Sequence, residues 1–426
     1  MSTSVNPIIT EHPKRSGPVR SLYNRDYRLL WIASLITISA WMMQMVARGW
    51  LIREMTHSPF YVTLVFAAGS FPMLIFTILG GVLADRMDRR WLVIANDVAG
   101  FFLYSLLSIL VFTHRVEVWH VLAVSFATGV GFALSMPARQ SIIPSLVPRE
   151  DLGNAIALST AMFSASQTVA PAIAGFLIHL IGNGGCFLVS SLILVAPPLL
   201  VRAISVARTS GARRDQNALQ NIKEGFLYTK RSALIASLIV MGAVGTVFAM
   251  PYQALMPVIA GDVLQVGEQG LGLLLAAAGV GALLASVSLA FLSDSHFLGK
   301  ILLLSSPGLG LALILFSVSP SFLLALAMAV VIGYSMQMFL TSNFTVVQIV
   351  VPDDLRGRVL SIRMIIFGMA PIGQILGGWV SESIGPERNG TPWTLALVGA
   401  ICIVLMLIVI ASSKELRRTW RHIDRT

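Results

Sequence analysis

The chain has 426 residues, a formal net charge of +10 and a mean hydropathy of +0.80, and 56% of its residues are hydrophobic and 12% charged. In a soluble protein roughly a quarter of the residues are charged, so this composition argues against a soluble enzyme or a nucleic-acid-binding protein. Apolar runs of about 18 residues or more recur along the whole length and predict an all-α membrane protein that crosses the bilayer many times.

The segment before the first apolar run, residues 1–28, is polar, basic and proline-bearing. It has no apolar core followed by a cleavage site, so we expect a cytoplasmic segment rather than a secretory signal peptide.

Twelve apolar runs follow, each of roughly 20 residues, the length that spans a bilayer as an α-helix. The predicted spans are 29–52, 62–84, 91–113, 118–142, 152–181 and 184–203 in the first half, and 233–260, 271–293, 301–318, 321–346, 359–381 and 394–411 in the second half.

One long polar interval divides these spans into six and six. We therefore expect a six-helix bundle at 29–203, a cytoplasmic central loop at 204–232, a second six-helix bundle at 233–411 and a basic cytoplasmic tail at 412–426. Within the central loop, residues 221–230 fit an amphipathic helix on the inner leaflet, although a solvated linker is the simpler interpretation.

The lysines and arginines decide the orientation, because cytoplasmic loops of membrane proteins are enriched in them. With the N-terminus inside, most of these residues fall in cytoplasmic segments, and only Arg53, Arg115 and Arg388 fall outside. We expect a multi-pass protein of the bacterial inner (plasma) membrane with both termini in the cytoplasm.

A dense charged cluster lies between the second and third spans, where residues 81–90 read GVLADRMDRR. The second half has a weak copy of it, since Ala290-Phe-Leu-Ser-Asp294 lines up with Gly81-Val-Leu-Ala-Asp85. The second copy lacks the arginines. This asymmetry indicates that the two halves differ at their cytoplasmic ends.

Several motifs together resemble a known superfamily. They are GxxxDRxxRR after the second span, Trp50-Leu51, the turn Met55–Pro59, Pro137–Gln140 and the segment Leu146–Leu152. The chain from about Tyr27 to Ser412 is similar to the major facilitator superfamily, and specifically to its transmembrane secretion effector branch. That branch includes enterobactin-type siderophore exporters and macrolide efflux proteins.

The resemblance implies the major facilitator superfamily fold, with 12 transmembrane helices in two pseudo-symmetric six-helix bundles around a central cavity. Helices 1, 4, 7 and 10 would line that cavity. The candidate substrate-binding residues on them are Trp41, Gln44, Arg48, Tyr252, Gln253, Tyr334 and Gln337.

Arg48 is open to two interpretations. It shares one helix face with Trp41 and Gln44, and together they suit an amphipathic substrate of anionic or phenolic character. Alternatively, because it lies only about one turn from the helix end, its side chain snorkels to the outer headgroups.

The charged cluster is the candidate cytoplasmic gate. The resemblance implies that Asp85 docks against the start of helix 11, near Arg358 and Arg363, where a carboxylate suits a helix N-terminus. The contact would hold the outward-facing state. The full set of gate candidates is Gly81, Asp85, Arg86, Arg89, Arg90, Asp294, Arg358 and Arg363. Alternatively, the arginines act only as topology signals.

Asp97 and Arg139 are predicted to form an ion pair. Asp97 lies two turns into helix 3 and Arg139 about two turns from the end of helix 4, so antiparallel neighbours place them at similar depth. The pair either locks the conformation, or Asp97 is a proton carrier that takes up a proton when the pair opens.

We predict a secondary active transporter, not an enzyme, that exports a small amphipathic molecule by alternating access. No phosphate-binding loop is present, so an ion or substrate gradient has to drive it, and proton coupling is expected. The candidate substrates are a siderophore-like metabolite or a range of drugs, with import as an alternative and a non-transporting sensor as a weaker one. We expect no cofactor or metal, no nucleic acid, a lipid bilayer around the protein and a monomer.

Overall fold

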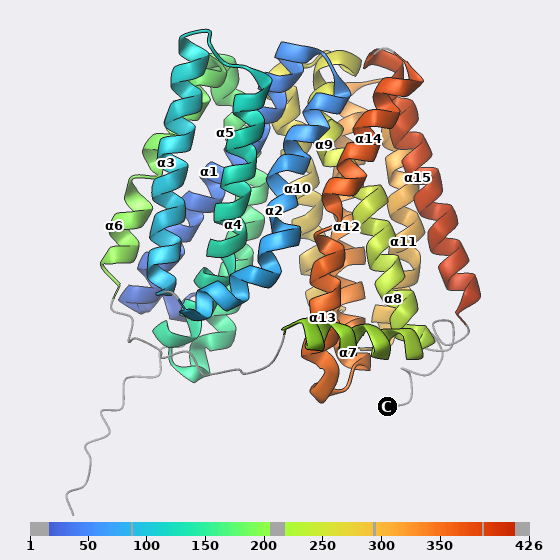
Figure 1. Cartoon of the computed structure of the whole chain (residues 1–426). Helices are drawn as coiled ribbons and strands as arrows, with labels where there is room; N and C mark the ends of the chain where they lie inside the picture. Colours follow the sequence, from blue (N-terminus) through green and yellow to red (C-terminus); the bar gives the residue numbers. More distant parts are fainter. Residues whose placement is uncertain (1–16, 87, 205–217, 293–294, 386, 414–426) are drawn as a thin grey trace, which may run out of the picture.

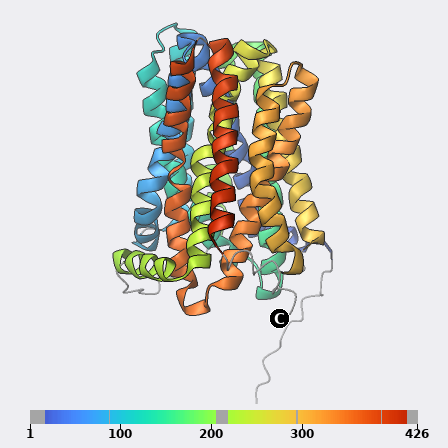
Figure 2. The same cartoon turned by 90° about the vertical axis from the view of Figure 1, so that its right-hand side faces the viewer.

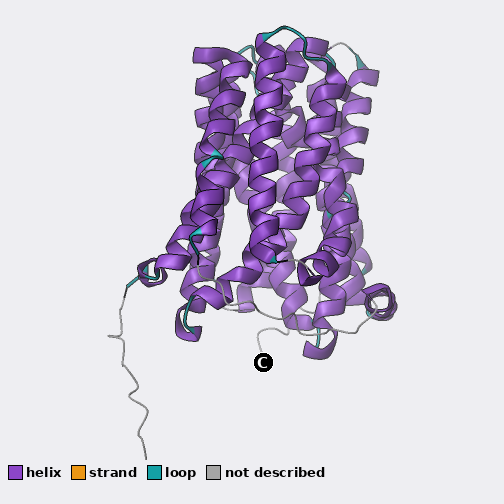
Figure 3. Cartoon of the chain, turned by 60° about the vertical axis from the view of Figure 1, so that its left-hand side comes forward, coloured by secondary structure: helices purple, strands orange, loops and turns teal. Residues whose placement is uncertain are grey.

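The computed structural model describes residues 17–86, 88–204, 218–292, 295–385 and 387–413, and within these ranges it is helical without any strand (Figures 1 and 3). Long helices run side by side, and the described ends of the chain lie at the same end of the molecule (Figure 1). We call this end the terminal side and the other end the opposite side.

The first half begins with a short 3₁₀ turn, η1, and ends with α6. Asn24 caps α1, because its side chain accepts hydrogen bonds from the backbone N–H groups of Asp26 and Tyr27. The elements are η1 (Arg20–Tyr23), α1 (Arg25–Thr56), α2 (Pro59–Arg86), α3 (Arg89–Phe112), α4 (Val118–Leu146), η2 (Arg149–Asp151), α5 (Leu152–Ile193) and α6 (Ala196–Arg202).

The helix α5 contains a reversal of the chain at Gly182. This residue has φ 72° and ψ 176°, a conformation open in practice only to glycine, and no atom lies within 4 Å of the place where its Cβ would be. A straight helix over the whole run from Arg149 to Arg202 would be about 80 Å long, far more than a bilayer needs. The reversal turns this run into two crossings.

The second half begins with α7, which lies crosswise at the terminal side (Figures 1 and 2). Its seventh span is interrupted by two π-helical turns on either side of Pro251, a residue that cannot donate a backbone hydrogen bond. The elements are α7 (Ala218–Arg231), α8 (Ala233–Val244), η3 (Gly245–Ala249), α9 (Pro251–Val258), η4 (Ile259–Val263), α10 (Gly267–Phe291), α11 (Ser295–Ser317), α12 (Phe322–Val350), α13 (Asp353–Phe367), α14 (Ala370–Ile384) and α15 (Glu387–Ser412).

Eleven described helical runs are long and apolar enough to cross a membrane, and the reversal at Gly182 makes one of them a double crossing. The predicted all-helical fold with twelve spans is therefore confirmed. Two of the largest differences are at the last two spans, which begin at Asp353 and Glu387 rather than at Val359 and Thr394. Their first turns are polar and extend the helices beyond the apolar run that the sequence shows.

The two halves of the chain meet along two helix pairs, α2 with α14 and α5 with α10. Both pairs approach closely at glycine. A Cβ on Gly175 of α5 would lie 3.0 Å from the Cα of Gly272 in α10, and one on Gly378 of α14 would collide with Thr63 of α2. Small residues at helix crossings are the usual way for membrane helices to gain packing contacts.

Replacing Gly182 with alanine is expected to destabilise the protein by ~1–3 kcal/mol, because alanine rarely adopts this backbone conformation. Thermal unfolding of the purified protein in detergent measures the effect. Gly153→Ala is the matched control, since Gly153 also has open space at its Cβ position but no positive φ. Equal unfolding temperatures for the two variants would contradict the importance of the reversal.

Candidate functional site

Arg48 is a buried cation in the interior of the first half. Its side chain is 4% exposed, and its Nη1 donates to the hydroxyls of Ser125 and Thr128 on α4, at 3.0 Å each. Its Nε donates to the backbone carbonyl of Gln44 at 3.1 Å. No carboxylate of a described residue forms an ion pair with it. Arg48 therefore points from α1 toward α4. The snorkelling interpretation requires instead that it points toward the membrane surface.

Asp97 and Arg139 form a buried ion pair between α3 and α4. Nη2 of Arg139 donates to both carboxylate oxygens of Asp97, at 2.8 and 2.7 Å. Thr37 of α1 and Asn96 also donate to the same carboxylate, at 3.1 and 3.0 Å. Arg139 donates further to the Ser34 hydroxyl at 3.3 Å. The pair thus ties three helices together at the depth that the helix geometry predicts.

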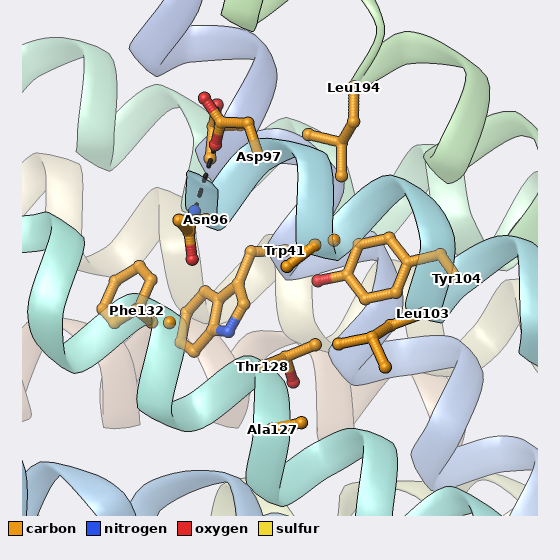
Figure 4. Close-up of a pocket in the computed structure, with 13 residues that line it drawn as sticks. Trp41, Asn96, Asp97, Leu103, Tyr104, Ala127, Thr128, Phe132 and Leu194 are labelled. Carbon is orange, nitrogen blue, oxygen red and sulfur yellow. Dashed lines mark hydrogen bonds between the residues drawn. The ribbon is translucent and has the colours of Figure 1, made fainter. Parts of the chain in front are cut away.

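A small pocket lies between Asp97 of this ion pair and Thr128, which binds Arg48 (Figure 4). Its volume is about 30 Å³, which is room for one or two waters. Trp41 stacks on Phe132 along its wall, with ring centroids 4.4 Å apart. Thr37, Asp97, Tyr104 and Thr128 line it as well, so the wall is polar at both ends. The pocket lies within the first half, among α1, α3, α4 and the end of α5.

Gln44, which the sequence places beside Arg48, is completely buried. Neither its amide nitrogen nor its amide oxygen has a hydrogen-bond partner among the described residues. A buried amide without partners is uncommon and costs about 1–3 kcal/mol, so its presence calls for an explanation such as a ligand or an ordered water.

The predicted substrate residues of the second half lie on α9 and α12. Tyr252 is buried in α9 and its hydroxyl accepts from the Gln253 amide at 3.3 Å, while Gln337 of α12 donates to Thr341 at 3.0 Å. Tyr334 packs against the hydrophobic core. None of the four lines the pocket beside Trp41, and neither do Gln44 and Arg48.

The gate candidates are only partly described. The side chains of Gly81, Asp85 and Arg86, and the whole of Asp294, lie outside the described residues. Arg89 and Arg90 bind within the first half: Arg89 donates to the carbonyl of Ser141, and Arg90 donates to the carbonyls of Val201 and Arg202 at the end of α6. Arginine suits the negative end of a helix dipole, so these residues hold helix ends together.

In the second half, Arg363 binds to α12. Its Nη1 donates to Asn343 at 2.6 Å, its Nη2 donates to the carbonyl of Leu340 at 3.2 Å, and its guanidinium lies over the Phe344 ring. Arg358 lies where α13 meets α7, and its carbonyl lies 2.6 Å from where a Cβ of Gly225 would be. In this conformation Arg363 is thus engaged by α12.

A set of polar contacts between the halves lies on the opposite side, and the sequence did not predict it. Arg53 at the end of α1 forms an ion pair with Asp262 of η4. Glu382 of α14 accepts hydrogen bonds from the Ser58 hydroxyl and from the backbone N–H of Phe60, at the start of α2. The sequence offered one signal for the ion pair: Arg53 and Asp262 have opposite charges, and each closely follows a predicted span that ends on this side.

Further contacts between the halves lie deeper in the molecule. Ser70 of α2 donates to Gln374 of α14 at 2.8 Å, and Leu74 touches Gly368. Along the other helix pair, Thr168 of α5 touches Gly279 of α10. The polar contacts that join Arg53 with Asp262, Glu382 with the start of α2, and Ser70 with Gln374 thus lie on the opposite side and in the middle of the molecule. Among the described residues, no cluster of three His, Cys, Asp or Glu side chains could hold a metal ion.

A sequence model of the family described as transmembrane secretion effector matches residues 16–424. The chain is 24% identical over 396 residues to macrolide efflux protein A of Streptococcus pyogenes, covering 91% of this chain and 96% of that protein. It is 26% identical over 402 residues to the enterobactin exporter of Escherichia coli, covering 92% and 94% respectively. The crystal structure of a nucleoside transporter matches with a TM-score of 0.76 at 13% identity, covering 90% of this chain and 99% of that one.

Replacing Arg139 alone with methionine is expected to destabilise the protein by roughly 3–5 kcal/mol, because it leaves the Asp97 carboxylate buried without its cation. The double variant Arg139→Met with Asp97→Asn is expected to recover much of that loss, since it removes both charges. Thermal unfolding of the purified variants measures both effects. A double variant that is less stable than Arg139→Met would contradict the pairing.

Proposed function

Because the chain belongs to the transmembrane secretion effector family and has the major facilitator superfamily fold, we propose that it exports a small amphipathic molecule by alternating access. The efflux proteins among its relatives support transport, and the direction, the substrate and the energy source are part of the proposal.

The proposed location is the bacterial inner membrane, with the terminal side in the cytoplasm. The basic residues support this orientation, since Arg25, Arg149, Arg202, Lys230 and Arg231 lie at helix ends on the terminal side. The crosswise α7, with exposed Phe226 and Leu227, would then rest at the inner leaflet.

The observation that carries the proposal is the set of polar contacts that joins the halves on the opposite side. Arg53 with Asp262, and Glu382 with the start of α2, join the halves on the opposite side. An exporter that is closed on the outside and open toward the cytoplasm is ready to take up its substrate. In the alternate state these contacts break, and Asp85 docks against the start of α13 to close the cytoplasmic side.

The proposed substrate is a siderophore-like metabolite or a drug, and the two named relatives are an exporter of the first kind and an efflux protein of the second. Arg48, the unpartnered amide of Gln44 and the ring of Trp41 are the groups that we propose for recognition. Tyr252, Gln253, Tyr334 and Gln337 would join them from the second half. A pocket of about 30 Å³ is too small for a drug-sized molecule, so such a substrate binds between the halves.

Asp97 is the proposed site of proton coupling. Its side chain is completely buried in the first half, and its pair with Arg139 is held by residues of three helices. These helices would rearrange if the pair opens. We propose that the protein works as a monomer, because each chain contains both halves of the transport pathway.

Breaking the Arg53–Asp262 pair is expected to favour the state that is open on the opposite side. In a Thr63→Cys reporter, Asp262→Ala is expected to speed labelling by an impermeant maleimide about fivefold, the effect of ~1 kcal/mol. Thr63 is a suitable reporter because it is fully buried against Gly378.

The control for this labelling experiment is Arg115→Ala, which removes an exposed charge from the turn between α3 and α4. The swapped pair Arg53→Asp with Asp262→Arg is expected to restore slow labelling. Labelling that is unchanged in Asp262→Ala would contradict the closure.

Transport itself is tested in everted membrane vesicles with a panel of siderophores, macrolides and dyes, with and without a pH gradient. We expect accumulation of at least one compound, and in Asp97→Asn the loss of the response to the pH gradient with normal insertion. Accumulation of no compound under any gradient would count against an exporter, and a retained pH response in Asp97→Asn would exclude Asp97 as the proton carrier.

A further inference from the structure

Arg48 has hydrogen-bond donors left over. A guanidinium carries five N–H donors, and the contacts of Arg48 use Nε and Nη1. The two hydrogens of Nη2 have no acceptor among the described residues. All the partners of this guanidinium are neutral hydroxyls or a carbonyl, so the contacts orient it without balancing its charge.

Two further donors face the pocket beside it. Neither the indole N–H of Trp41 nor the hydroxyl of Tyr104 has a hydrogen-bond partner among the described residues, and both side chains line the pocket. The Tyr104 oxygen points toward Trp41 in Figure 4. The Thr128 hydroxyl, which binds Arg48, lines the same pocket. The indole N–H of Trp41 and the hydroxyl of Tyr104 are thus unused donors at a cavity of about 30 Å³, and Thr128 connects the wall of this cavity to Arg48.

The charges around the pocket do not cancel. Asp97 lies at the other end, but Arg139, Thr37 and Asn96 occupy its carboxylate. Arg139 balances that one negative charge, so Arg48 adds a net positive charge to the buried interior of the first half. A buried charge without a counter-charge is costly, and binding an anion next to it removes that cost.

We propose that Arg48, Trp41 and Tyr104 form a binding site for a single anionic group, and that Thr128 orients the Arg48 guanidinium beside it. The group comes either from a small inorganic anion such as chloride, which a cavity of about 30 Å³ can hold, or from the transported molecule itself. The second source rests on the proposed export function, and the first does not.

The anion has a consequence for the energetics of export. A substrate that leaves the cell as an anion moves negative charge out of a compartment that is electrically negative. The membrane potential then drives its export, by about 50-fold in concentration for each charge at 100 mV. This electrical contribution adds to any proton coupling.

The first experiment measures anion binding by thermal unfolding of the full-length protein in detergent. Replacing sodium gluconate by sodium chloride at equal ionic strength is expected to raise the unfolding temperature by about 3 °C or more if chloride occupies the site. Arg48→Ala is expected to abolish this shift, Arg48→Lys to retain part of it, and the control Arg115→Ala to retain all of it.

The second experiment measures transport in proteoliposomes with two dyes of the same xanthene scaffold, the anion carboxyfluorescein and the cation rhodamine 6G. A potassium diffusion potential set with valinomycin, positive inside the vesicle, is expected to drive accumulation of the anion. Reversing the potential is expected to prevent it, and Arg48→Ala is expected to remove it.

The outcomes separate this site from the proposed function. A chloride shift that depends on Arg48, without transport of either dye, supports the anion site and counts against export of such molecules. Uptake of the anion that depends on both Arg48 and the potential assigns the site to the substrate. No chloride shift in the wild-type protein, together with dye transport that ignores Arg48 or the potential, would overturn the anion site and leave export standing.

Discussion

A charge inside the hydrocarbon core of a membrane has to find its partners within the protein, because no water is there to solvate it. In the first half of this chain that requirement fixes how the helices face one another. Asp97 and Arg139 can meet only if α3 and α4 run side by side, and Thr37 brings α1 against both. Arg48 repeats the connection between α1 and α4 further along the same helix face. A pocket lies between the ion pair and the α4 residues that bind Arg48, and polar side chains from both line it.

The second half is built differently. Its polar interior contacts are fewer among the described residues, with Arg363 held by α12 as the clearest example. Its seventh span contains two π-helical turns around a proline instead of one continuous α-helix. The halves meet where glycines allow α5 and α10, and α2 and α14, to approach closely. The first half thus has a polar site and the second half has an interrupted helix, which agrees with the uneven charge of the sequence between residues 81–90 and 290–300.

The sequence predicted those features that depend on one helix or on two neighbours. Apolar run length gave the twelve spans, and counting turns from helix ends placed Asp97 and Arg139 at the same depth. Helix starts at Asp353 and Glu387 were missed because polar first turns leave no hydropathy signal. The ion pair between Arg53 and Asp262 was also missed, since it depends on how the halves meet, which no local pattern records. The stacking of Trp41 on Phe132 was not predicted either, because it depends on how α1 and α4 are rotated about their axes.

On the opposite side, only short connections join the described helices. The longest of them runs only from Thr113 to Glu117, and at Gly182 the chain reverses within a single residue. A protease needs an extended, flexible stretch to bind, and so do many partner proteins. With the proposed orientation, the protein therefore presents to the outside of the cell mainly the ends of rigid helices. The described connections on that side would then offer little extended chain for recognition from outside the cell.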